Sequence, residues 1–233
     1  MVQKDTSDLV DQGLEKINTE DYDESIIFFN KALKIEPNNS EALSFKGFAL
    51  IQLKKYDEAV KWIDKAIKID PENSDYQQYK GMALLGLGKF DESLKIFNNL
   101  LKTDKNNNWI IYLKGKALFG LERFKESLNC YEKVLIKNPD NIDLLIDKCD
   151  AIYYLQEFDK AAECYGKIVA KYPTDENIWF NKGLSHYDSG NNHESLRSMK
   201  EVLKLNPEHV GAWYFDGLNL FELKKYKKAL ESF

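Results

Sequence analysis

The five prolines of the chain share one 34-residue period. Every interval between neighbouring prolines is 34 or 68 residues, and the positions are Pro37, Pro71, Pro139, Pro173 and Pro207. Five residues share one phase of such a period by chance with odds of about one in a million, and a period of about 20 to 50 residues is typical of repeat proteins. The chain is therefore predicted to be an array of repeated units.

Four further columns of residues recur in the same register. A glycine column is interrupted only by Cys149. An aromatic column, a small column and a large apolar column follow it at fixed spacing. Their members are Gly13, Gly47, Gly81, Gly115, Gly183 and Gly217; Tyr22, Tyr56, Phe90, Phe124, Phe158 and Tyr226; Ser25, Ala59, Ser93, Ser127, Ala161, Ser195 and Ala229; and Phe29, Ile63, Phe97, Tyr131, Tyr165, Met199 and Phe233.

Each unit is predicted to be two helices joined by a short turn. In the second unit, apolar residues recur at helical spacing on both sides of the turn at residues 54–56. Pro71 ends the second helix because proline cannot continue it. The glycine and small columns are expected where the two helices cross closely, since a larger side chain would separate them. The predicted units are residues 6–39, 40–73, 74–107, 108–141, 142–175, 176–209 and an incomplete 210–233, within a single array over residues 1–233.

These columns resemble the tetratricopeptide repeat. Trp179 and Trp213 each precede a column glycine by four residues and match the family's tryptophan. The resemblance covers residues 6–233. It implies an all-α fold, an α-solenoid in which tandem 34-residue helix-turn-helix repeats form a right-handed superhelix. The second unit matches the motif through Leu43, Gly47, Tyr56, Ala59, Ile63, Ala66 and Pro71.

A lysine just before the glycine column departs from the family's motif, which has leucine there. The stems of these lysines are expected to pack while the ammonium groups extend to water. A functional row of amines along the array is the alternative. The column consists of Lys46, Lys80, Lys114, Lys148 and Lys182.

The charge pattern argues against nucleic acid and membranes as partners. The net charge is −5, and basic residues are interspersed with acidic ones. A nucleic-acid binder needs a concentrated basic face to neutralise phosphates. No apolar run approaches the ~18 residues that span a bilayer. The polar N-terminus lacks the apolar core of a signal peptide.

The cysteines predict reduced thiols and a cytoplasmic protein. Cys130, Cys149 and Cys164 are odd in number and lack C-x-x-C spacing. Cys149 is expected to replace glycine in its column because a thiol is small. Cys130 and Cys164 share one phase on successive second helices, whose axes are expected about 8–10 Å apart. Such a distance does not favour a disulfide.

No constellation of residues predicts catalysis, a cofactor or a metal, so the protein is predicted not to be an enzyme. Catalysis needs a nucleophile, a base and an orienting group brought together. The only histidines are His186, His193 and His209. His186 lies in a column of mainly Leu and Ile, which predicts a position near the core. A metal site from His186, His193 and an acid such as Asp188 or Glu194 is an alternative that no H-x-x-x-H spacing supports.

The resemblance implies that the first helix of each unit lines a concave groove that holds an extended peptide or a helix of a partner protein. Groove positions combine aromatic residues with acids and Lys116, so we expect an apolar-anchored partner with Lys or Arg flanks. The residue set with which family members grip a chaperone's terminal carboxylate is not assembled. Predicted partner-binding residues are Phe48, Met82, Trp109, Tyr112, Phe119, Tyr153, Phe180, Tyr187 and Tyr214, with an anchor cluster at Trp109, Tyr112, Phe119 and Tyr153.

The leading hypothesis is a non-catalytic scaffold for protein–protein interaction. One alternative is a recruiting or regulatory arm of a larger enzyme whose catalytic domain lies outside this chain. Another is a scaffold that self-associates through uncapped ends, since residues 210–233 make an incomplete unit with Ala229, Leu230 and Phe233 on an unfinished helix.

Overall fold

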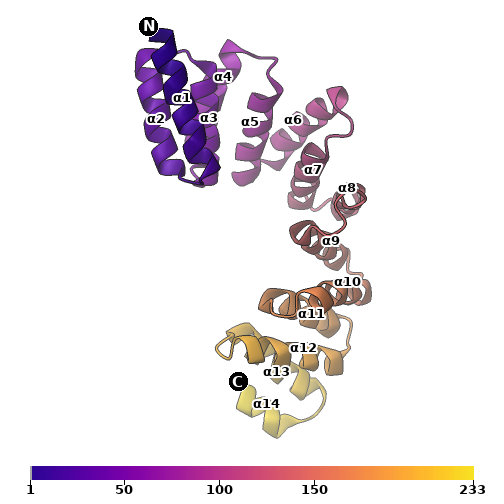
Figure 1. Ribbon diagram of the computed structural model, residues 1–233. Coiled ribbons are helices and arrows are strands. Elements are labelled where there is room, and N and C mark those ends of the chain that lie inside the picture. Colours follow the sequence, from indigo (N-terminus) through magenta and orange to yellow (C-terminus); the bar gives the residue numbers. More distant parts are fainter. Residues whose placement is uncertain (1) are drawn as a thin grey trace. The chain divides into compact units, whose positions relative to one another are not determined.

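The computed structural model describes residues 2–233, and side chains from residue 6 onward. These residues form α-helices joined by short turns, and each predicted unit contains two of them (Figure 1). The all-α fold of tandem helical repeats is confirmed. The helices are α1 Val2–Asn18, α2 Tyr22–Ile35, α3 Ser40–Gln52, α4 Tyr56–Ile69, α5 Ser74–Gly86, α6 Phe90–Thr103, α7 Asn108–Gly120, α8 Phe124–Leu135, α9 Ile142–Tyr154, α10 Phe158–Lys171, α11 Glu176–Asp188, α12 Asn192–Leu205, α13 Val210–Glu222 and α14 Tyr226–Ser232.

The helices form two compact units, Met1–Arg123 with α1 to α7 and Phe124–Phe233 with α8 to α14. Within each unit, helices that follow one another in sequence pack together. The first helices of neighbouring hairpins also contact each other, as α1, α3, α5 and α7 do in turn, and as α11 and α13 do. Within each unit, the surface that its odd-numbered helices share is called the first-helix face of that unit below.

A side-chain cap begins each of the first helices α3, α5, α7, α9, α11 and α13. The Asn39 Oδ1 accepts a hydrogen bond from the Ala42 N–H at 2.9 Å, which satisfies one of the free donors of the first turn. His209 caps α13 in the same way, its Nδ1 accepting a hydrogen bond from the Ala212 N–H. The capping residues recur in the 34-residue register as Asn39, Asn73, Asn107, Asn141, Asp175 and His209.

Each hairpin turn contains one residue with positive φ. In the hairpin turn between α3 and α4, Lys54 has φ 58° and the Lys55 N–H donates to the Leu50 carbonyl at 2.8 Å. This hydrogen bond closes the end of α3 and reverses the chain. Only two of the seven turns use glycine, so the fold imposes this conformation on other residues too. The positions are Glu20, Lys54, Gly88, Glu122, Gln156, Gly190 and Lys224.

The glycine column lies where the two helices of a hairpin cross, as predicted. A Cβ built on Gly47 would lie 2.4 Å from Ile63 Cγ1, a residue of the large apolar column. A Cβ on Gly81 would lie 2.6 Å from Phe97 Cε1, and Phe97 is fully buried. The Ser93 hydroxyl donates to the Gly81 carbonyl at 2.9 Å across the same crossing. The glycine and small columns therefore set how closely the helices approach.

A second pair of glycines makes room for the preceding hairpin. A Cβ on Gly86 would lie 2.5 Å from the Tyr56 ring, and one on Gly120 would lie 2.5 Å from the Phe90 ring. Tyr56 and Phe90 belong to the aromatic column, which thus packs against the next hairpin in the first unit. The glycine column did not predict this contact, because Gly86 and Gly120 lie outside it.

The prediction of reduced thiols is wrong for Cys149 and Cys164, which form a disulfide between α9 and α10. Cys149 occupies the glycine column, where the two helices approach most closely, so its Cα lies 5.6 Å from that of Cys164. The prediction considered only the distance between Cys130 and Cys164, on successive second helices, and missed the partner of Cys164 within its own hairpin. Cys130 is half-buried on α8, outside this disulfide.

Removing the disulfide should destabilise the second unit. A loop of this size, with the cysteines 15 residues apart, contributes about 3 kcal/mol by restricting the unfolded chain. Urea unfolding of Cys149→Ala/Cys164→Ala should show this loss. A reducing agent should lower the unfolding midpoint of the unsubstituted protein and leave that of the double variant unchanged. An equal response to the reducing agent in both proteins would contradict the assignment.

Substituting Gly81 should test the helix crossing. Gly81→Ala should destabilise the protein by about 1–3 kcal/mol because the new methyl group overpacks Phe97. Gly166→Ala on α10 is the matched control, since a Cβ there lies 3.8 Å from the nearest atom, on Lys182. That control should stabilise by about 1 kcal/mol through helix propensity. Phe97→Leu should reduce the cost of Gly81→Ala in a double-mutant cycle of urea unfolding. Equal effects of the two Gly→Ala changes would exclude a tight crossing.

Candidate functional site

An apolar cavity of about 440 Å³ opens on the first-helix face of the first unit. Its walls come from α3, α5 and α7, together with aromatic residues at the starts of α4 and α6. Its composition is typical of a surface that binds apolar side chains, with one cation at the edge. The lining residues are Ile51, Tyr56, Met82, Leu85, Gly86, Phe90, Trp109, Leu113, Lys116, Phe119 and Gly120.

Three of the predicted partner-binding residues, Met82, Trp109 and Phe119, line this cavity. Trp109 is 48% exposed, an unusual amount for so large an apolar side chain, and its ring lies 5.6 Å from that of Tyr112. The Lys116 ammonium lies 5.9 Å from the Tyr112 ring centroid. The first unit therefore brings together the aromatic residues predicted on α7.

Phe48 lies on α3 beside a residue that the sequence prediction omitted. Its ring centroid is 5.1 Å from that of Tyr79 on α5. Tyr79 occupies the position just before the lysine column, and Phe45 and Phe215 occupy the same position in other units. This recurrence was the available signal for Tyr79.

In the second unit, Phe215 connects three predicted residues. Its ring centroid lies 5.9 Å from Phe180, 5.3 Å from Tyr187 and 5.4 Å from Tyr214. Tyr214 is 52% exposed. Burial, and then the Glu222 carboxylate, raise the pKa of Tyr187, so its phenol stays a hydrogen-bond donor. Phe215 thus supports an aromatic cluster on the first-helix face of α11 and α13.

Tyr153, the fourth predicted residue of the second unit, takes part in a tyrosine–carboxylate arrangement. Its hydroxyl donates to Asp188, and the hydroxyl of the buried Tyr165 donates to Asp150. Burial is the first cause that raises the pKa of both tyrosines, and the carboxylates act in the same direction. A small cavity of about 110 Å³ adjoins Asp150, Tyr153, Tyr154 and Tyr165. Aromatic rings with a carboxylate are suited to a cationic side chain.

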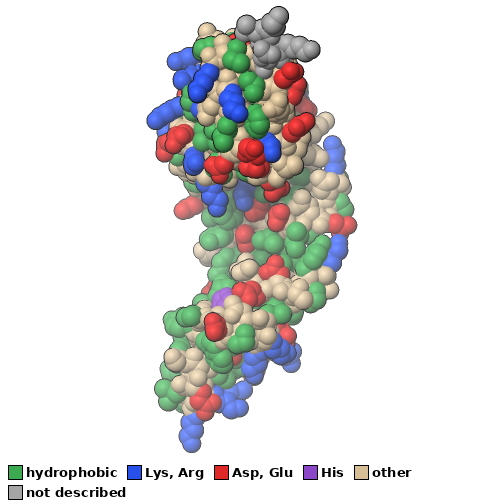
Figure 2. All heavy atoms as spheres, turned by 60° about the vertical axis from the view of Figure 1, so that its left-hand side comes forward, with side chains coloured by type: hydrophobic (Ala, Val, Ile, Leu, Met, Phe, Trp, Pro, Cys, Tyr) green, Lys and Arg blue, Asp and Glu red, His purple; other side chains and the backbone are tan. Residues whose placement is uncertain are grey.

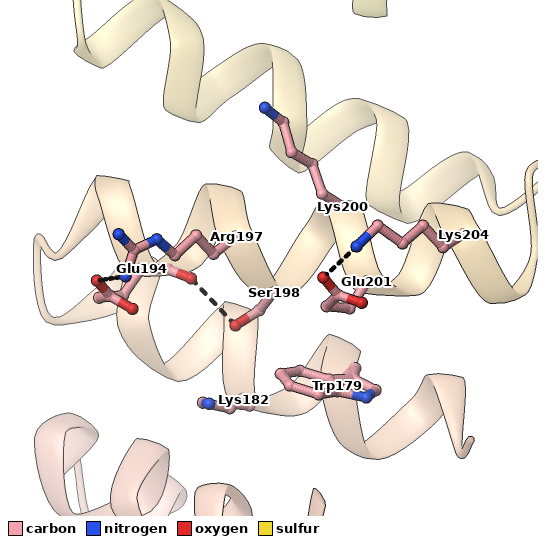
Figure 3. Close-up of a pocket in the computed structure, with 8 residues that line it drawn as sticks. All are labelled: Trp179, Lys182, Glu194, Arg197, Ser198, Lys200, Glu201 and Lys204. Atoms are coloured by element: carbon pink, nitrogen blue, oxygen red, sulfur yellow. Dashed lines mark hydrogen bonds and ion pairs between the residues drawn. The ribbon is translucent and has the colours of Figure 1, made fainter. Parts of the chain in front are cut away.

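Lysine and arginine side chains gather along one side of the C-terminal helices (Figure 2). A second cavity of about 440 Å³ is formed by α11 and α12 and is lined in part by cationic side chains (Figure 3). Arg197 pairs with Glu194 at 2.8 Å, and Lys204 pairs with Glu201 at 2.6 Å. The lining consists of Trp179, Lys182, Glu194, Arg197, Ser198, Lys200, Glu201 and Lys204.

Three lysines of the lysine column, Lys46, Lys80 and Lys148, contact the preceding hairpin through their ammonium groups. The Lys46 Nζ lies 2.6 Å from Asn30 Oδ1 and 3.4 Å from the centroid of the Trp62 ring. Lys46 is buried, and burial lowers its pKa. The prediction that these groups extend to water is therefore wrong for Lys46.

Two other lysines of the column reach a carboxylate at the same offset of 16 residues. Lys80 pairs with Asp64 at 2.7 Å, and Lys148 pairs with Glu132 at 2.9 Å. The two lysine side chains are 30% and 28% exposed and their carboxylates are 40% and 49% exposed, so each ion pair joins neighbouring hairpins at a partly hydrated position. A contact between repeats, rather than a solvated row, is the structural role of these lysines.

His186 is half-buried on α11 in a column of apolar residues, close to the predicted place. Its Nδ1 is buried without a hydrogen-bond partner among the described residues. Burial lowers the pKa of the imidazole, and the Lys182 charge lowers it further, while Glu194 and Asp159 oppose the shift. The described residues contain no group of three or more His, Cys, Asp or Glu side chains placed to hold a metal.

His186 should make the stability of the protein depend on pH. Its folded pKa lies below the ordinary value of 6.5, so the unfolded chain binds more protons as the pH falls. The free energy of unfolding should therefore be constant above that value and decrease as the pH falls from it towards the folded pKa. Chemical unfolding of His186→Leu between about pH 5 and 7.5 should show a shallower decrease. A stability difference between the two proteins that is independent of pH would contradict this.

Stacked helical hairpins with close glycine crossings and a shared first-helix face define a class of repeat proteins. The chain belongs to the tetratricopeptide repeat family. Two tetratricopeptide repeat models match it, one over residues 17–82 and the other over residues 112–176 and 180–233. The model for anaphase-promoting complex, cyclosome, subunit 3 matches residues 52–134. No curated protein sequence matches the chain.

Solved structures of similar fold differ widely in sequence. A tetratricopeptide repeat protein from Parabacteroides merdae has a TM-score of 0.73 at 14% identity, covering 98% of this chain and 91% of that one. YrrB, described as having an unusual peptide-binding site, has a TM-score of 0.63 at 17% identity over 79% of this chain and 95% of its own. The Cut9–Hcn1 hetero-tetramer of the APC/C gives 0.73 at 14% identity, over 94% of this chain and 45% of that one. These similarities show the fold.

The helices of residues 2–233 include none that is both long enough and apolar enough to cross a membrane.

Proposed function

We propose that the chain is a non-catalytic scaffold that holds a peptide or a helix of a partner protein on its first-helix face. The apolar cavity beside Trp109 is the observation that carries this proposal. Tetratricopeptide repeat proteins are generally scaffolds for protein–protein interaction, and the fold neighbours include one described by its peptide-binding site. These observations support a protein partner.

The geometry of the cavity favours an apolar anchor. Its lining is mainly carbon, and Trp109 and Phe119 offer broad ring surfaces from one helix. Exposed aromatic residues that surround a concave surface are typical of the centre of an interface, where a few side chains contribute most of the binding energy. A leucine or phenylalanine of the partner would remove these rings from water.

Acidic residues on the first-helix face favour basic flanks on the partner. In the first unit, which holds the apolar cavity, Asp75 is exposed at the start of α5. In the second unit, Asp143 is exposed at the start of α9, and Asp150 lies beside the tyrosines of the smaller cavity. Carboxylates placed in this way attract Lys and Arg and oppose acidic segments. The partner is therefore proposed to combine an apolar anchor with basic residues.

Peptide binding tests the proposal. A displayed library of random peptides of about 15 residues should yield binders with a Leu, Phe or Trp anchor and Lys or Arg nearby. Trp109→Ala should weaken the best of these peptides by about tenfold or more in fluorescence anisotropy, since aromatic anchors contribute about 2 kcal/mol or more. The loss of Lys or Arg from the peptide should weaken binding further at low salt.

Ile69→Ala is the matched control for this experiment. Ile69 is 46% exposed at the end of the second helix α4, so its truncation removes a similarly exposed apolar side chain away from the cavity. Binding should stay within about twofold. Selection of no peptide, or equal effects of Trp109→Ala and Ile69→Ala, would overturn the proposed site.

The cytoplasmic location remains a prediction. The Cys149–Cys164 disulfide removes its argument from reduced thiols, because disulfides persist in oxidising compartments. The single array and the right-handed superhelix also remain predictions, as do the enzyme-arm and self-association alternatives.

A further inference from the structure

The cavity between α11 and α12 lies among charges that the proposed function does not use. It is formed by Trp179 and Lys182 of α11 and by six residues of α12 (Figure 3). Four of the lining side chains are cationic and two are carboxylates, so the cavity is locally positive in a chain whose net charge is −5. Both Glu194 and Glu201 already pair with cations of the same helix.

Lys182 differs from Lys80 and Lys148, two other lysines of its column, in what it faces. Lys80 and Lys148 each pair with a carboxylate 16 residues earlier, and the same place before Lys182 is Gly166. A Cβ on Gly166 would lie 3.8 Å from Lys182 Cε and 4.0 Å from its Nζ, so the ammonium lies directly over the glycine. No described residue forms an ion pair with Lys182. Gly166 therefore leaves this position without the carboxylate that Asp64 and Glu132 provide in two other hairpins.

The positions 16 residues before the lysine column form a further column, here called the acceptor column, and its place after Gly166 carries a cation. Asn30, Asp64 and Glu132 occupy it in earlier hairpins, and Lys200 occupies it on α12. Lys200 is exposed, and among the described residues it forms no ion pair. The hairpin of α11 and α12 thus adds a positive charge where others supply an acceptor.

Trp179 provides an aromatic wall. Its indole N–H donates to the Pro173 carbonyl at 2.9 Å, which fixes the ring, and the Lys182 ammonium lies 4.8 Å from the ring centroid. A fixed ring beside an ammonium group can bind an apolar side chain and a carboxylate that follow one another in a peptide. The cavity volume of about 440 Å³ accommodates two such side chains.

We propose that this cavity is a second docking site, which binds an acidic peptide segment of a protein partner. An Asp or Glu of that segment pairs with Lys182, taking the place of the absent carboxylate, and a neighbouring apolar side chain packs on Trp179. Lys200 and the exposed ends of Arg197 and Lys204 attract further acidic residues. The site lies apart from the apolar cavity of the first unit and selects the opposite charge.

The charge distribution favours an acidic peptide over a phosphate polyanion. Two of the four cations are neutralised by glutamates of their own helix, and Arg197 uses its guanidinium on Glu194. Nucleic acids and polyphosphates require several unneutralised cations in a row. A carboxylate requires only one or two, and it tolerates neighbouring glutamates better than a phosphate does.

Binding of a labelled acidic peptide tests the proposal. The probe is a peptide of about 12 residues with Asp and Glu around one Leu and one Phe. The comparison peptide has Asn and Gln in place of the acids. Fluorescence anisotropy should show binding of the acidic peptide that weakens as salt rises from about 50 to about 300 mM. The neutral peptide should bind at least about tenfold more weakly than the acidic peptide.

Two pairs of variants separate the site from the general charge of the protein. Lys182→Gln/Lys200→Gln should weaken the acidic peptide by about tenfold. Lys61→Gln/Lys95→Gln removes the same charge from exposed positions on α4 and α6 and should change binding by less than about twofold. Equal losses in the two double variants would overturn the proposal.

Gly166 gives a test that leaves every lysine in place. Gly166→Glu places a carboxylate opposite Lys182, as Glu132 lies opposite Lys148. It should weaken binding of the acidic peptide by about fivefold or more. Gly166→Ala fills the same space without charge and should leave binding unchanged. Unchanged binding in Gly166→Glu would exclude Lys182 as the cation that holds the peptide.

Competition distinguishes the remaining occupants. Inorganic polyphosphate or a single-stranded oligonucleotide that displaces the peptide at lower concentration, with the same dependence on Lys182, would assign the cavity to phosphate polyanions and overturn the proposal. Loss of acidic-peptide binding in Trp109→Ala, with no loss in Lys182→Gln/Lys200→Gln, would place the peptide on the first-helix face instead. We expect instead that Lys182→Gln/Lys200→Gln loses acidic-peptide binding and that Trp109→Ala keeps it. This expectation does not depend on whether the first-helix face binds a peptide.

Discussion

The rest of the structure depends on the close crossing of two helices within each hairpin. At this crossing a residue without a side chain meets a large buried one, as Gly47 meets Ile63 and Gly81 meets Phe97. Close approach removes both apolar stripes from water and fixes the angle at which the next hairpin can pack. Where Cys149 replaces the glycine, a disulfide to Cys164 joins the same two helices covalently. In the hairpin of α9 and α10, a covalent bond therefore holds the two helices together at the position where other hairpins have a glycine.

Stacking of hairpins creates the first-helix face and the contacts between neighbouring hairpins. The residue type at both varies from unit to unit where packing does not determine it. The first-helix face carries the apolar cavity beside Trp109 in one unit and the aromatic cluster around Phe215 in the other. Contacts between hairpins use the lysine column, whose partners range from Asn30 to Glu132. Gly166 breaks that series and leaves Lys182 beside a cavity. Departures from the repeat therefore coincide with the places proposed to bind partners.

Periodicity predicted the helical hairpins, the crossing of Gly81 and the near-core position of His186, because these depend on residues within one unit. It also placed Trp109, Tyr112 and Phe119 on one helix. It missed the cap that His209 makes to the Ala212 N–H three residues later, although the capping residues recur in the same register. It did not predict the Cys149–Cys164 disulfide, since a disulfide depends on which side chains of neighbouring helices meet. The aromatic contacts of Phe215 and the ion pair of Lys80 with Asp64 were missed for the same reason.

The sequence by itself determined the fold class, since 34-residue spacing of proline, glycine and aromatic residues is compatible with few architectures other than stacked helical hairpins. It also determined which residues lie at the crossings, because only small side chains fit there. Only the tertiary structure decided which lysines find a carboxylate, which aromatic rings share a cavity and which cysteines pair. These outcomes depend on distances between neighbouring helices, and such distances follow from packing in three dimensions rather than from the repeat period.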